Sequence, residues 1–184
     1  MNQARYFTWV SLFAIVVFLM GCTADSLSTG QPIASSTLQP VIGRDLQIVT
    51  GQEVYIPAYS EVFAGRQGMN TRLAITLAIH NTDPDSPIII QTVRYYDTNG
   101  TLVRNYIDEP VEVSPLATTG FLVEETDDSG GWGSNFIVEW VAENPVYEPI
   151  IEAIMISTRS AQGISMISTG RVISQTGSTR ATTD

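Results

Sequence analysis

The chain has 184 residues and a formal net charge of −10, because nine basic residues face 19 acidic ones. Every basic residue is an arginine, and the absence of lysine excludes both a P-loop and Schiff-base chemistry. The acidic balance also argues against a nucleic-acid partner, which would require a positive surface on the protein.

Residues 1–21 have the three parts of a secretory signal peptide. Arg5 and the amino terminus form a short cationic head, and residues 7–20 form an apolar segment that only Thr8 and Ser11 interrupt. A transmembrane helix needs about 20 apolar residues. This segment has 14, so it fits a cleaved signal better than a permanent membrane span.

The only cysteine of the chain, Cys22, directly follows this segment. The preceding Leu19, Met20 and Gly21 resemble the lipobox that the lipoprotein signal peptidase recognises. The resemblance implies cleavage before Cys22, a diacylglyceryl group on its thiol and a lipid anchor in a bacterial membrane. Thr23 stands where an aspartate usually marks retention in the inner membrane, which favours the periplasmic face of the outer membrane in a double-membraned cell. The alternatives are an uncleaved signal anchor and ordinary secretion with an incidental cysteine.

The composition divides the rest of the chain into three parts. Residues 22–43 are rich in Ser, Thr, Gln, Pro and Gly, which predicts a flexible tether. Residues 44–174 form the predicted domain, which must be stabilised by a hydrophobic core because no second cysteine is available for a disulfide. Residues 175–184 have a similar composition to the tether and are expected to be disordered.

The domain has the sequence pattern of antiparallel β-structure. Residues 73–80 alternate strictly, which predicts a strand with one face in the core. Residues 81–87, Asn-Thr-Asp-Pro-Asp-Ser-Pro, predict a turn in which the Asn and Asp side chains bind nearby backbone amides. Residues 97–100, Asp-Thr-Asn-Gly, predict a tight hairpin because Asn-Gly accepts positive φ angles. The predicted strands cover residues 54–56, 73–80, 88–96, 101–106, 111–113, 119–125, 136–141, 150–158 and 164–173.

This series of about eight or nine strands, separated by turn signals and without a segment of helical periodicity, predicts an all-β fold. We expect a single antiparallel immunoglobulin-like β-sandwich after the signal peptide and the tether. Scaffolds of this kind carry binding residues on the loops that join their strands.

The loop after the predicted strand 119–125 is the best candidate for a binding site. Four carboxylates fall within five residues and precede a glycine-rich segment that contains a tryptophan. Carboxylate oxygens suit Ca²⁺, but the ligand order of an EF-hand is missing, so Asp127 and Asp128 are weak metal candidates. Trp132 offers an exposed aromatic anchor for a partner, and a solvated loop without a ligand is the alternative. The candidate binding residues are Glu124, Glu125, Asp127, Asp128, Trp132 and Asn135.

Other polar residues are weaker candidates. His80 is the only histidine; we expect it on the exposed face of its strand, without the partners of a zinc site. Glu139 and Glu152 could act as paired carboxylates on a glycan if their strands were neighbours, but strand alternation turns Glu139 outward. Arg94 and Arg104 flank the predicted hairpin, and we expect ion pairs there rather than anion binding.

A combination of short segments characterises the domain: residues 54–60 (VYIPAYS), 81–84 (NTDP), 95–97 (YYD), 102–104 (LVR), 121–125 (FLVEE), 129–131 (SGG), 135–140 (NFIVEW) and 162–165 (QGIS). Together these segments resemble an uncharacterised family of small bacterial lipoproteins, known only as a domain of unknown function. The resemblance covers roughly residues 50–173. It implies an exported lipoprotein with one compact domain, and it supplies no catalytic residues because the family has no assigned activity.

We therefore expect a lipid-anchored binding or structural module of the cell envelope, with an envelope protein as partner and no cofactor apart from the lipid on Cys22. An enzyme is not expected, because no Gly-x-Ser-x-Gly elbow or other catalytic motif occurs. The alternatives are an envelope glycan hydrolase that uses carboxylates and a Ca²⁺-stabilised adhesion or assembly module. An open sheet edge could also accept a strand from a partner.

Overall fold

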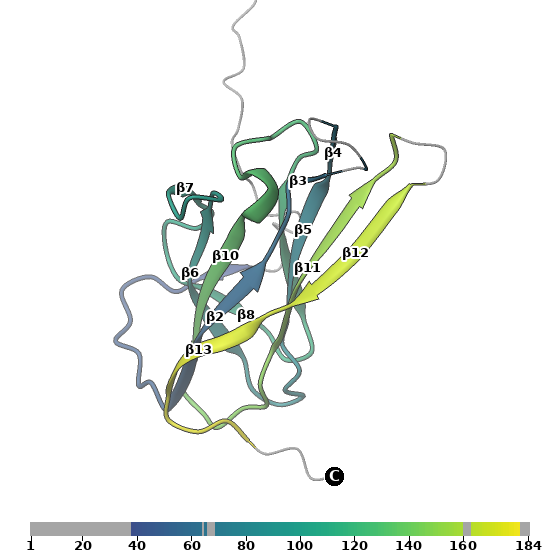
Figure 1. Cartoon of the computed structure of the whole chain (residues 1–184). Coiled ribbons are helices and arrows are strands. Elements are labelled where there is room, and N and C mark those ends of the chain that lie inside the picture. Colours follow the sequence, from purple (N-terminus) through teal and green to yellow (C-terminus); the bar gives the residue numbers. More distant parts are fainter. Residues whose placement is uncertain (1–37, 64, 66–68, 160–162, 181–184) are drawn as a thin grey trace, which may run out of the picture.

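The computed structural model describes residues 38–63, 65, 69–159 and 163–180. Two antiparallel sheets pack as a β-sandwich (Figure 1), so the predicted all-β sandwich is confirmed. The described residues form 13 strands rather than eight or nine. The predicted signal peptide and residues 19–22 lie outside the described residues. None of the described residues forms a helix of the length and hydrophobicity that a membrane span needs.

The larger sheet is built around a long central strand. This strand, β10, pairs along its length with β2 on one side and with β6 on the other. The sheet follows the order β1 (Gln39–Pro40), β8 (Val111–Val113), β6 (Ile88–Tyr96), β10 (Asn135–Ala142), β2 (Thr50–Pro57) and β13 (Arg171–Thr176), with β7 (Leu102–Asn105) beside β6.

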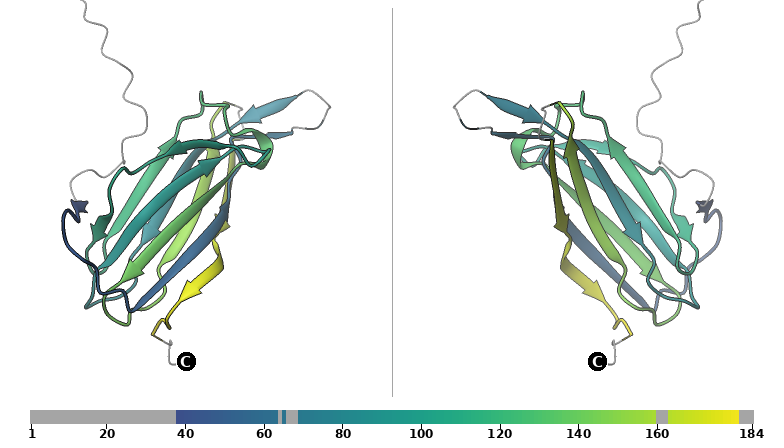
Figure 2. Two further views of the ribbon diagram at one scale, coloured as in Figure 1. Left: turned by 90° about the vertical axis from the view of Figure 1, so that its left-hand side faces the viewer. Right: turned by 90° about the vertical axis from the view of Figure 1, so that its right-hand side faces the viewer.

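The smaller sheet has four strands in the order β12 (Ile164–Thr169), β11 (Ile150–Ser157), β5 (Ala74–His80) and β9 (Thr118–Val123). Strands β3 (Glu61–Phe63) and β4 (Asn70–Arg72) form a separate hairpin. Figure 2 shows this hairpin projecting from one end of the sandwich. The 3₁₀ turn η2 (Gly131–Gly133) precedes β10.

The core lies between the two sheets and follows the predicted alternation. Ile75, Leu77 and Ile79 of β5 are completely buried, as their period of two requires. Tyr95 is completely buried and the adjacent Tyr96 is half-exposed, because successive residues of a strand face opposite sides of the sheet. Trp140 has the largest fully buried side chain among the residues that the structure describes.

Two features differ from the sequence-based expectation. The prediction of one strand over residues 164–173 was wrong, because the chain leaves the smaller sheet at Gly170 and enters the larger sheet as β13. The short strands β1, β3 and β4 were not predicted, since two or three residues are too few to show a period. Strand β1 lies within the residues expected to form the tether, and β13 ends at Thr176, inside the residues expected to form the tail.

Candidate functional site

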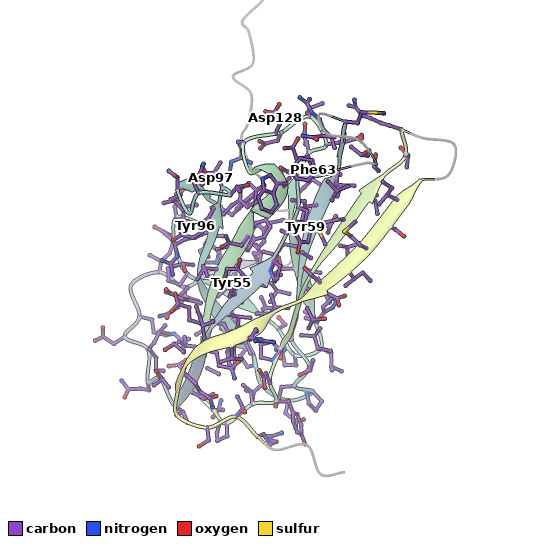
Figure 3. The ribbon with its side chains drawn as sticks, viewed as in Figure 1. Tyr55, Tyr59, Phe63, Tyr96, Asp97 and Asp128 are labelled. Carbon is purple, nitrogen blue, oxygen red and sulfur yellow. The ribbon has the colours of Figure 1, made fainter. Side chains whose placement is uncertain are left out.

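The candidate loop lies at the end of the sandwich that carries the β3–β4 hairpin. The loop joins Val123, the last residue of β9, to Asn135, the first residue of β10. Figure 3 shows Phe63 of the hairpin and Asp128 of the loop at this same end, with Tyr59 below them. We call residues 61–63, 70–72 and 124–135 the tip.

Hydrogen bonds fix the loop to two neighbouring turns. Thr98 donates its N–H and its Oγ1 hydroxyl to the carbonyl of Gly130 at 2.9 and 3.0 Å, and its Oγ1 accepts the N–H of Gly133 at 3.0 Å. Ser60 donates its N–H and its Oγ hydroxyl to the carbonyl of Gly131 at 3.2 and 3.1 Å. The predicted 97–100 hairpin therefore forms one of the supports of the tip.

Three of the four loop acids form ion pairs with arginines from different parts of the chain. The pair that involves Asp127 is the least exposed, with 25 and 20% of the two side chains accessible, and screening by water weakens it less than the outer pairs. Burial alone raises the pKa of Asp127, but hydrogen bonds from Ser129 and the charge of Arg104 hold that pKa below its ordinary value. The pairs are Glu125–Arg159 (2.7 Å), Asp127–Arg104 (3.1 Å) and Asp128–Arg72 (2.6 Å).

The two carboxylates that were weak metal candidates are both engaged in ion pairs with arginines. Asp127 and Asp128 bind Arg104 and Arg72, which lie on β7 and β4. Among the residues that the structure describes, no three His, Cys, Asp or Glu side chains are placed to hold a metal ion together. Three of the four loop acids thus act as partners of arginine at the tip.

Two aromatic side chains lie exposed on the tip. The rings of Phe63 and Trp132 have centroids 5.9 Å apart and are tilted by 44°, although 62% of Phe63 and 53% of Trp132 remain accessible. The sequence pattern indicated Trp132 as a candidate but gave no indication of Phe63. The signal that could have revealed Phe63 is a lone large aromatic next to a glycine-containing turn, which is weak in the absence of strand periodicity.

The loop rests directly on the core. A Cβ atom on Gly130 would lie 1.8 Å from the hydroxyl oxygen of Tyr95, so only glycine fits at that position. Burial raises the pKa of Tyr95, which keeps its hydroxyl neutral beneath the loop. The other two candidate residues lie at the margins, since Glu124 is exposed at the start of the loop and Asn135 already belongs to β10.

Residues 51–173 match the model of a family described as a protein of unknown function (DUF3124). The chain belongs to the DUF3124 family. A search of curated proteins and a search of solved structures gave no match. The matched residues run from β2 into β13 and include the whole tip, so the tip is part of the DUF3124 domain.

Glu139 and Glu152 do not form a carboxylate pair in the DUF3124 domain, because they lie on β10 and β11 of different sheets. Glu139 instead lies opposite Glu53 of β2. Nη2 of Arg94 binds both carboxylates, at 2.5 Å from Glu139 and 2.9 Å from Glu53. The guanidinium of Arg94 therefore pairs with two carboxylates on neighbouring strands.

The remaining polar candidates make contacts with neighbouring residues of the DUF3124 domain. Nδ1 of His80 lies 2.9 Å from Oγ1 of Thr118, and Nε2 lies 3.9 Å from a carboxylate oxygen of Glu152, which is not the geometry of a catalytic triad. The turn after β5 has the expected side-chain hydrogen bonds. Asn81 Oδ1 accepts the N–H of Asp83 at 3.0 Å, and Asp83 Oδ1 accepts two further backbone N–H groups.

Proposed function

We propose that the protein is a lipid-anchored, extracytoplasmic binding module of the bacterial envelope and that the tip is its recognition surface. The exposed Phe63–Trp132 pair carries this proposal, because aromatic residues on a rigid support are the usual anchors of protein interfaces. The hydrogen bonds from Thr98 and Ser60 hold the loop in place before binding, which lowers the entropy that an encounter would cost.

The charges around the aromatic pair support a protein partner in the envelope. The arginines neutralise three of the loop acids, which reduces the acidic charge beside the exposed aromatic pair, while Glu124 stays exposed at the margin of the tip. Interfaces between proteins have this composition, with aromatic residues at the centre and charged residues at the margin. We therefore propose an envelope protein whose surface offers an apolar pocket for Trp132.

A photo-reactive phenylalanine analogue in place of Trp132 is expected to crosslink to one partner in intact cells. The same analogue in place of Leu116 is the matched control. Leu116 is 68% exposed but lies beside the turn at the other end of β5, where its N–H donates to the carbonyl of Asp83. Equal crosslinking from both positions, or none from position 132, would exclude the tip as the recognition surface.

The second aromatic ring provides an independent check. Phe63→Ala removes the ring that packs against position 132, and truncation of an interface anchor costs more than about 1 kcal/mol. We expect the crosslinking yield from position 132 to fall roughly tenfold in this variant, while Leu102→Ala, which truncates an exposed residue on β7 (51% accessible), leaves it unchanged.

The lipid anchor is tested by Cys22→Ser. We expect this variant to lose labelling by a radioactive fatty acid and to keep residues 1–21, because the diacylglyceryl group needs the thiol and the signal peptidase recognises the modified cysteine. The protein is then expected to migrate as a larger species in gel electrophoresis. Thr23→Ser, one residue further on, is the control and should retain both the label and the size of the wild type. A labelled, fully processed Cys22→Ser protein would contradict the anchor.

A further inference from the structure

One end of the smaller sheet has an unprotected edge. Strand β12 pairs, within the described part of the chain, with β11 alone, so the backbone N–H and C=O groups on its other side are free to pair with another strand. The sequence of Ile164–Thr169, ISMIST, contains no charge and no proline. Its register with β11 is continuous, without a bulge. Edge strands of native proteins usually carry a charge, a proline or a bulge, each of which hinders pairing with another chain.

At the other sheet ends that the structure describes, a proline, a charge with a register shift, or a covering side chain is present. Strand β1 has two residues, one of which is Pro40. The ladder of β7 contains Arg104 and a register shift, and that of β13 contains Arg171 and a register shift. On β9 the hydroxyl of Tyr106 donates to the carbonyl of Leu122 at 3.2 Å and so occupies part of the edge. The contrast identifies β12 as the edge that is open to another strand.

The surface next to this edge also lacks the acidic character of the rest of the protein. A chain with a net charge of −10 repels its own copies wherever acidic surfaces meet. Beside the edge, however, the exposed side chains of β12 are the uncharged Ser165, Ile167 and Thr169, and 63% of Ile167 is accessible. On β11, 45% of Ile156 is accessible, and the acidic Glu152 lies at the far end of the ladder, opposite Thr169. Two copies can therefore approach here without bringing like charges together.

We propose that two copies of this chain associate through β12, antiparallel across a two-fold axis, with Ile167 of one copy opposite Ile167 of the other. A two-fold axis makes the same surface meet itself, and two identical strands then run antiparallel. Residues opposite each other in a ladder share a face. This register therefore places the outward Ser165 opposite the outward Thr169 and joins two four-stranded sheets into one. The inference is independent of the function proposed for the tip.

Ile167→Lys in the full chain tests the proposal. We expect the wild type, purified in mild detergent, to sediment with the mass of two chains, and Ile167→Lys to sediment with the mass of one, because the two-fold axis places two like charges opposite each other. Ile150→Lys is the matched control: this isoleucine is also exposed (49%), but it lies on β11 beyond the residues that pair with β12. The Ile150→Lys protein should sediment with the mass of two chains, and so should Trp132→Ala, which alters the tip alone.

Several results would overturn the proposal. One is a wild type with the mass of one chain, and another is an Ile167→Lys protein with the mass of two. An Ile150→Lys protein with the mass of one chain would show that the two copies meet through the outer face of the sheet and not through the edge of β12. A second protein present in equal amount with the wild-type chain would show that a foreign strand occupies the edge. A circular dichroism spectrum of Ile167→Lys equal to that of the wild type shows that the variant is folded and that the change from two chains to one is a loss of association.

Cysteine crosslinking measures the register directly. Residues opposite each other in an antiparallel ladder have Cα atoms about 4.5–5.5 Å apart, a separation that a disulfide can span. Oxidation should therefore link Ile167→Cys into a dimer on a non-reducing gel. Ser165→Cys alone should remain unlinked, whereas the double variant Ser165→Cys, Thr169→Cys should be linked. The wild type shows whether Cys22 alone forms a disulfide, and Thr118→Cys on the β9 edge shows how much linkage random collision produces. Equal disulfide linkage in these controls and in Ile167→Cys would refute the pairing.

Discussion

Asp83→Ala is expected to lower the free energy of unfolding by about 3 kcal/mol. The Asp83 side chain is completely buried. Its carboxylate accepts the N–H of Asp85 and of Ser86 at 3.0 and 2.9 Å and the N–H of Tyr147 at 3.1 Å, and Arg180 lies 3.4 Å away. Alanine leaves these three N–H groups without their acceptor and separates the turn after β5 from the segment before β11. Urea unfolding followed by tryptophan fluorescence measures the loss.

The same carboxylate should make the protein sensitive to acid. Burial raises the pKa of Asp83, but the three N–H donors and the charge of Arg180 outweigh burial, so the pKa lies below the ordinary value of 3.8. A carboxyl whose pKa is lower in the folded state stabilises the fold above the unfolded pKa, and this stabilisation is lost as the pH falls through the folded pKa. The free energy of unfolding of Asp83→Ala should therefore depend less on pH below about 4 than that of the wild type.

Asp85→Ala is the control for both measurements. Asp85 belongs to the same turn and lies 4.0 Å from Arg180, but 77% of its side chain is accessible. Its loss should change the free energy of unfolding by less than about 0.5 kcal/mol. If Asp83→Ala and Asp85→Ala were equally stable, the turn would not depend on the buried carboxylate.

Local sequence patterns predicted those parts of the fold that local physics determines. Strands β5 and β6 lie where alternation and β-branched residues placed them. The hairpin forms at residues 97–100, with Gly100 at a φ of 80°, because glycine accepts that angle at no steric cost. The side-chain hydrogen bonds of Asn81 and Asp83 were predictable for the same reason, since Asx turns close over two or three residues.

The candidate site depends on contacts that no local pattern contains. The acidic loop and Trp132 could be recognised as a candidate from composition, but the ring that packs against Trp132 comes from Phe63 in a hairpin too short to show a period. Arg72, on the β4 strand of that hairpin, pairs with Asp128 from 56 residues away in sequence. Ion pairs of Arg94 and Arg104 were expected because both arginines flank the predicted hairpin, and both form them. The carboxylates that they bind were not predicted.

The same limit explains the error at Gly170. Residues 164–173 are rich in β-branched side chains and contain no proline, so the sequence predicts one strand although the chain changes sheets in the middle. A glycine in a strand pattern often marks a close approach of two backbones. This signal could have located the corner, which is the point where the chain passes from one sheet to the other. The N–H of Gly170 donates to the carbonyl of Ile151 at 2.8 Å, which fixes the crossing point against β11.

Gly170→Ala is expected to lower the free energy of unfolding by about 2–3 kcal/mol, because an added methyl group has no space at the corner. Its Cβ would lie 2.6 Å from Cγ1 of Val54, 3.0 Å from the carbonyl oxygen of Ile151 and 3.1 Å from Cγ1 of Ile56. The backbone oxygen cannot move without disturbing β11, so relief must come from the core side chains. The urea midpoint measures the loss, and the exposed neighbour Thr169→Ala, which adds no atom, should leave the midpoint nearly unchanged.

A double-mutant cycle identifies steric crowding as the cause. Val54→Ala removes the atom closest to the new methyl group and destabilises the protein by itself through the cavity that it leaves. In that background Gly170→Ala fills part of the cavity, so its cost should be clearly smaller than in the wild type. Equal costs in the two backgrounds would contradict crowding against Val54 and would assign the destabilisation to the contact with the Ile151 carbonyl. An unchanged urea midpoint for Gly170→Ala alone would show that the crossing between the sheets can widen, and that glycine is not required where the chain passes from β12 to β13.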